Sequence, residues 1–123
     1  MKPYKLPAGL KLGSATAATQ IEGDDGFCNW SKWAADGNVK GVDAGFAADD
    51  HWNRYVEDID IMAGLNHEVY RMSIEWSRVE PVEGQWSEEG LNHYVDEIRR
   101  MKEKGIETLV TLHHFSCPQW NQD

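Results

Sequence analysis

The sequence lacks the features that mark membrane-spanning and nucleic-acid-binding proteins. No stretch approaches 18 consecutive apolar residues, so we expect no transmembrane helix. No run of five or more basic residues occurs, and 21 acidic against 12 basic side chains give a formal net charge of −9. Because nucleic acids and anionic bilayers bind basic surfaces, we expect no nucleic acid and no membrane as partner.

Cysteine is scarce, and the spacing of Cys28 and Cys117 fits neither a metal site nor a disulfide scaffold. Residues 1–13 contain no apolar core of the kind that signal peptides have, so a reducing, cytoplasmic setting is predicted. The chain does have 41% apolar residues and six tryptophans, which is enough for a core. Its 123 residues allow at most one ordinary domain.

Three β-rich stretches alternate with two amphipathic segments. The first stretch, 11–16, is built of small residues that would let backbone or ligand come close. The other two, 67–76 and 106–115, are rich in β-branched, aromatic and other apolar residues, which predicts strands. Apolar side chains recur at three- and four-residue steps in 49–65 and again in 87–105, which predicts two helices.

This alternation predicts an α/β fold with parallel strands joined by right-handed crossovers. With polar groups at the strand ends, it suggests the first three strands and two helices of a (β/α)8 TIM barrel, which needs about 250 residues. Residues 1–123 would then be the N-terminal portion of a single TIM-barrel domain, incomplete in this chain. Three parallel strands leave edges and an apolar face uncovered, so self-association through the sheet edges is expected.

The connection after the first predicted strand, residues 24–48, is unusually long. It contains scattered glycines and several aromatic residues, which indicate a loop that packs on the rest of the domain. Connections of this length in a compact domain are usually functional loops or lids. A short helical turn is predicted within it at 31–35.

Polar side chains follow or occupy the carboxyl ends of all three predicted strands. In a parallel barrel these ends converge on one face, where amide, imidazole and aromatic groups could hold a sugar. The candidates are Gln20 and Glu22 after the first strand, Arg71 and Glu75 on the second, and His113 and His114 on the third.

Four of these candidates have an alternative, structural interpretation. Gln20 could be an ordinary loop residue. Arg71 lies within an apolar strand, where an unpaired charge is costly, so it should have a carboxylate partner, either in a structural ion pair or in a site. Glu22 and Glu75 could be catalytic carboxylates, although solvated loop acids are far commoner.

The histidines do not predict a metal site. His113 and His114 are adjacent, so on a strand they would face opposite sides and could not readily bind one ion together. His51 and His93 fall on the two predicted helices and are expected at the surface.

Four segments in order resemble the N-terminal part of a glycoside hydrolase of family 1, the family of β-glucosidases, β-galactosidases and 6-phospho-β-glucosidases. They are LGSATAATQIEG (12–23), DDHWNRYVEDIDIMAGL (49–65), YRMSIEWSRVEP (70–81) and GLNHYVDEIRRMKEKGIETLVTLHHFSCPQW (90–120). The resemblance covers nearly the whole chain and is weakest in the long connection. It implies a retaining β-glycosidase that needs no cofactor.

The resemblance also implies roles for single residues. Gln20 and His114 match family residues that hold hydroxyls of the substrate sugar, and Arg71 matches the arginine that pairs with the catalytic nucleophile. Phe115 stands where the family usually has tryptophan, which keeps an aromatic ring but loses the indole N–H. Residues 116–118, Ser-Cys-Pro, depart from the Asp-Leu-Pro often found there.

In this family one glutamate protonates the leaving oxygen and a second, about 5 Å away, attacks the sugar. Their Asn-Glu-Pro and Glu-Asn-Gly motifs do not occur in these 123 residues, so we expect no catalytic residue here and no activity from this chain alone. The alternatives are a product that only binds sugar or self-associates and, less favoured, a barrel hydrolase that uses zinc. The sequence does not choose between glucosides, galactosides and 6-phospho-glycosides.

Overall fold

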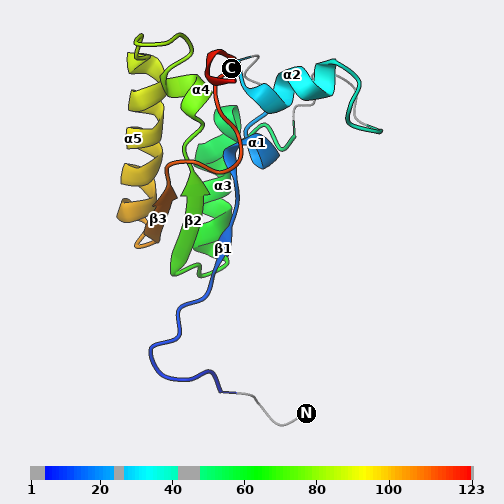
Figure 1. Ribbon diagram of the computed structural model, residues 1–123. Helices are drawn as coiled ribbons and strands as arrows, with labels where there is room; N and C mark the ends of the chain where they lie inside the picture. The colour runs from blue at the N-terminus through cyan, green and yellow to red at the C-terminus, as the bar shows by residue number, and fades with distance from the viewer. Residues whose placement is uncertain (1–4, 24–26, 42–47, 123) are drawn as a thin grey trace.

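The protein is described by a computed structural model, which covers residues 5–23, 27–41 and 48–122. Its centre is a parallel sheet with the strand order β1 (Gly13–Ala15), β2 (Val69–Ser73) and β3 (Glu107–Thr111) (Figure 1). Each strand lies inside a stretch for which a strand is predicted. The α/β partial-barrel architecture is therefore confirmed.

The strands are shorter than predicted at their carboxyl ends. β2 stops at Ser73, because the chain then turns into the short helix α4 (Trp76–Val79). β3 stops at Thr111, so the two neighbouring histidines lie beyond it. The prediction that they lie on the third strand is therefore wrong.

The two predicted crossover helices are α3 (His51–Gly64) and α5 (Glu88–Glu103). α5 begins as its sequence suggests, because the Ser87 hydroxyl accepts a hydrogen bond from the Gly90 N–H at 3.1 Å. Both helices pack on the same face of the sheet (Figure 1). In the described part of the chain, no helix is long and apolar enough to cross a bilayer.

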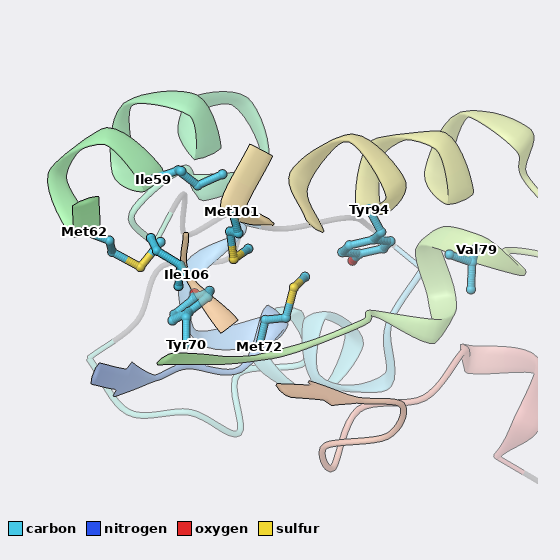
Figure 2. Packing of buried hydrophobic residues seen from close by; sticks show 8 residues of the cluster. All are labelled: Ile59, Met62, Tyr70, Met72, Val79, Tyr94, Met101 and Ile106. Carbon is cyan, nitrogen blue, oxygen red and sulfur yellow. The ribbon is translucent and has the colours of Figure 1, made fainter. Parts of the chain in front are cut away.

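The hydrophobic core lies between these helices and the sheet (Figure 2). Tyr70 and Met72 of β2 point toward the helices, and Arg71 between them belongs to the opposite face. The buried cluster is completed by Ile59, Met62, Val79, Tyr94, Met101 and Ile106. A single apolar layer thus holds the fold, and the other face of the sheet carries Arg71 and the exposed Leu109.

Short helices gather at the carboxyl end of the sheet (Figure 1). They are α1 (Ala18–Ile21), α2 (Asn29–Ala35), α4 and the 3-10 helix η1 (Gln119–Asn121). α2 confirms the helical turn predicted at 31–35 and begins two residues earlier. The rest of the predicted loop lies partly outside the described residues. These short elements surround the strand ends where the candidate residues fall.

Candidate functional site

The candidate site lies at the carboxyl end of the sheet, where α1 follows β1, α4 follows β2, and residues 112–118 follow β3 (Figure 1). Parallel strands bring these three connections to one edge, although they are distant in sequence. An isolated antiparallel bridge between Cys28 and Pro118 ties the connection after β3 to the start of α2. The predicted convergence of strand ends is therefore present.

Arg71 of β2 lies at the centre of this end. Its Nη1 donates a hydrogen bond to the Thr16 carbonyl oxygen at 2.6 Å and lies 3.4 Å from Nδ1 of His114. Because arginine only donates, Nδ1 must act as the acceptor, which leaves Nε2–H of His114 free to donate to a ligand. None of the ion pairs formed among the described residues includes Arg71. The expected carboxylate partner is not found in this part of the chain.

His114 and Phe115 form an aromatic pair beside Arg71. Their rings meet edge to face, with centroids 4.8 Å apart and an interplanar angle of 71°. The backbone of Phe115 has a φ of 67°, an uncommon value for a residue with a side chain. Phe115 is 75% exposed and so is open to a ligand. Arg71, His114 and Phe115 are therefore brought together as one cluster.

Gln20 is not the ordinary loop residue that its alternative interpretation suggested. It lies in α1, and its exposed side chain makes no hydrogen bond to any other residue that the structure describes. Among the described residues, no hydrogen bond joins its side chain to the cluster around Arg71. The link runs instead through its neighbour Thr19 to a buried carboxylate, that of Glu75.

Glu75 is neither a solvated loop acid nor an open catalytic group, because it is only 3% exposed. One carboxylate oxygen, Oε2, accepts from the hydroxyls of Thr19 at 3.1 Å and Ser116 at 2.5 Å. The other, Oε1, accepts from the hydroxyl and N–H of Ser77 at 2.9 and 3.4 Å. Its oxygens are thus occupied by protein donors from three strand ends.

Glu22 is also buried, so the expectation of a solvated acid is wrong here too. Its carboxylate accepts from Arg78 Nε at 2.8 Å and from the Tyr94 hydroxyl at 2.9 Å. Burial raises the pKa of Glu22 from 4.5 to about 7, against the opposing effects of Arg78 and Tyr94. Glu22 therefore fastens the end of α1 to α4 and α5.

The two helix histidines were predicted at the surface, but His51 is buried and His93 is half-buried. His51 lies between Asp58 and Glu97, with ring nitrogens 2.6 and 3.1 Å from their carboxylates. Burial by itself would lower the pKa of His51, but hydrogen bonds to Glu97 and Asp58 outweigh it and raise the pKa to about 9. His93 stacks on Trp52 at a centroid distance of 3.7 Å, and burial lowers its pKa.

The spacing of His51 and Asp58 in the sequence could have indicated that these two residues interact. Asp58 lies seven residues later in α3, hence on the same helical face.

Among the described residues, no group of three or more histidine, cysteine, aspartate or glutamate side chains could hold a metal ion.

Beside the cluster of Arg71, His114 and Phe115, a groove of about 450 Å³ runs between α2 and Phe115, with Trp30 and Trp33 in its wall.

A parallel strand–helix sheet with a polar and aromatic cluster at its strand ends defines the class of (β/α)8-barrel proteins. Comparison with known proteins identifies the family within this class to which the chain belongs. The sequence model of Glycosyl hydrolase family 1 matches residues 2–123, and the chain belongs to that family.

Its relatives carry β-glycosidase names. Beta-glucosidase A of Thermotoga maritima is 40% identical over 125 residues, which cover 96% of this chain and 28% of that protein. Beta-glucosidase 11 of Arabidopsis thaliana is 41% identical, over 96% of this chain and 24% of that protein. A solved β-glycosidase from Pyrococcus horikoshii matches with a TM-score of 0.86 and 36% identity, over 96% of this chain and 27% of that one. The chain spans about a quarter of the length of these relatives.

Proposed function

We propose that this chain is part of a retaining β-glycosidase that hydrolyses O-glycosidic bonds of β-glucoside-like substrates. The observation that carries the proposal is the cluster of Arg71, His114 and Phe115 at the carboxyl end of the sheet. It occurs in a chain of Glycosyl hydrolase family 1 whose relatives are named β-glucosidases.

Each residue has a part in this proposal. Nε2–H of His114 and the amide of Gln20 hydrogen-bond the sugar hydroxyls, and the exposed Phe115 ring packs against the sugar. Arg71, which lacks a carboxylate partner among the described residues, orients the nucleophilic glutamate. The acid and the nucleophile come from outside these 123 residues, because neither family motif occurs in them.

The test joins this chain in frame to the part of Thermotoga maritima Beta-glucosidase A that follows the matched region, and measures hydrolysis of an aryl β-glucoside. The joined protein should be active and the 123-residue chain alone inactive. His114→Ala should reduce kcat/KM by about a hundredfold or more, because a hydrogen bond to the sugar is lost in the transition state. His113→Ala, a change of the exposed neighbouring histidine, is the matched control. Equal losses in both variants would remove the assignment.

The alternative function is a catalytically inactive product that binds sugar or self-associates. The observation that favours it is the apolar surface left exposed on and after β3, at Leu109 and Leu112. Turnover by the unmodified chain, abolished by an internal substitution, would contradict the inactive alternative. The cytoplasmic location rests on composition alone and stays a prediction.

A further inference from the structure

The two halves of the proposed sugar site come from opposite edges of the sheet. Gln20 lies in α1, after β1, and the pair His114 and Phe115 follows β3. The whole of β2 lies between them in the strand order. Recognition of one sugar ring by both halves requires a fixed spacing, because displacements of about 1 Å can greatly weaken function.

Glu75 is placed to fix that spacing. Its Oε2 accepts hydrogen bonds from Thr19 and Ser116, and each of these residues is the direct neighbour of a proposed sugar contact. Thr19 precedes Gln20, and Ser116 follows Phe115. We propose that Glu75 is a positioning residue, whose single carboxylate oxygen holds the two sugar-binding segments in register with β2. Only the sugar-binding consequence of this proposal rests on the proposed function.

A purely structural role would use the other carboxylate oxygen. Oε1 accepts from the hydroxyl and N–H of Ser77 and thereby caps α4. The cap and the two site contacts are therefore separate, and substitutions at Thr19 or Ser116 remove the site contacts while the cap stays. Among the described residues, no buried side-chain polar atom lacks a hydrogen-bond partner, so the network is complete.

Glu80 provides a matched control. It is also buried, and its carboxylate accepts from Trp76 Nε1 at 2.7 Å and from the Gly84 N–H at 2.8 Å. Neither donor belongs to a sugar-binding segment. Glu80→Ala thus removes a buried carboxylate near the same helix and leaves both halves of the site attached.

The experiment is nuclear magnetic resonance on the whole 123-residue chain. The readouts are the ring–ring contact between His114 and Phe115 and the backbone coupling that reports the positive φ of Phe115. Ser116→Ala should abolish both signals and leave the side-chain amide resonances of Gln20 unchanged. Glu75→Ala should abolish both signals and also shift the Gln20 amide resonances. Glu75→Gln keeps the shape and one acceptor oxygen, so it should partly restore both signals and partly reverse the shift of the Gln20 amide.

Thr19→Val should shift only the Gln20 amide, and by less than Glu75→Ala does. The reason is a second attachment of α1, in which the Ala18 N–H donates to the Ser73 hydroxyl at 2.7 Å. If Glu75→Ala does not fold, the Ser116 and Thr19 variants decide the question by themselves. Unchanged His114 and Phe115 signals in Ser116→Ala would overturn the positioning role.

A titration with methyl β-D-glucopyranoside adds the functional readout. Glu75→Ala should raise the dissociation constant about tenfold relative to Glu80→Ala, which is the effect of losing one well-placed hydrogen bond. Equal dissociation constants in these two variants would overturn the link to sugar binding. If the unmodified chain did not bind the glucoside, the proposed sugar site would fail, and the ring and coupling signals would still decide whether Glu75 positions the two segments.

Discussion

Gly13 lies where the backbones of β1 and β2 leave no room for a side chain. A Cβ atom built on it would lie 1.6 Å from the carbonyl oxygen of Val69, its partner on β2. No side chain fits there without moving β1 away from β2. The prediction that small residues at 11–16 serve close approach is confirmed at this position.

Gly13→Ala should therefore lower the free energy of unfolding by about 2 kcal/mol or more, because the strands must separate to admit the methyl group. Urea unfolding of the 123-residue chain measures this. Gly64→Ala, at the end of α3, has no atom within 4 Å of its new Cβ and should be neutral or slightly stabilising. A similar loss in both variants would show that the cost does not come from contact with Val69.

The residues that sequence reasoning placed wrongly are those whose partners lie far along the chain. Glu75 is 56 residues from Thr19 and 41 from Ser116, so no local pattern reveals that it is buried. His51 likewise binds Glu97, 46 residues away on another helix. Periodicity reports which face of an element is apolar, and it is silent about polar groups that meet partners across the fold.

At the scale of elements, α3 and α5 are joined by His51, which bridges Asp58 of its own helix to Glu97 of the other. The pKa of His51 in the folded chain, about 9, is above its ordinary 6.5, so the folded state binds the proton more tightly. The resulting stabilisation is fully present below pH 6.5 and is lost as the pH rises through about 9. Glu22 also makes the stability fall as the pH rises, in this case from 4.5 to about 7. Its pKa is raised in the folded state, so the folded chain binds this proton more tightly than the unfolded chain.

We therefore expect the chain to be less stable at pH 9.5 than at pH 5, with His51 contributing roughly 3 kcal/mol of the difference. Urea unfolding across this range measures the effect. His51→Gln should flatten the dependence between pH 6.5 and 9, and His113→Gln, at an exposed position, should leave it unchanged. A steep dependence that persists in His51→Gln would contradict the bridge.

The element order, by contrast, follows well from the sequence. Each predicted strand and crossover helix is present, because alternation and helical periodicity reflect burial on one face. The ends of the second and third strands differ from the prediction: the extended pattern of 106–115 continues past Thr111, but β3 stops there. Arg71, His114 and Phe115 lie together at one end of the sheet, as predicted, whereas Gln20, predicted to join them, lies in α1 without a hydrogen bond to them.

At the scale of the whole molecule, one face of the sheet differs from the other. On the helix side, Tyr70 and Met72 of β2 are buried, whereas on the other side Leu109 of β3 is 52% exposed and Leu112 just beyond it is 75% exposed. β1 and β3 are also the outer strands of the sheet and pair on one side only. An apolar surface beside an unpaired strand edge favours association with another chain.

We expect the 123-residue chain to self-associate in a concentration-dependent way, measured by sedimentation velocity. Leu109→Lys should weaken association about tenfold or more, because burial of a leucine contributes about 1.5–3 kcal/mol. Val95→Lys, at an exposed position on α5, changes the charge equally and should have little effect. A monomer at all concentrations, or equal effects of both substitutions, would contradict association through the β3 side.

The one-sided core also has a consequence for the order of folding during synthesis. Its members run from Ile59 to Ile106 and β3 ends at Thr111, so the helix layer can close on β2 and β3 once residues 59–111 have left the ribosome. The attachments of Glu75 to Thr19 and Ser116 join segments before and after it, so the candidate sugar site is expected to take shape last, on a support that has already formed.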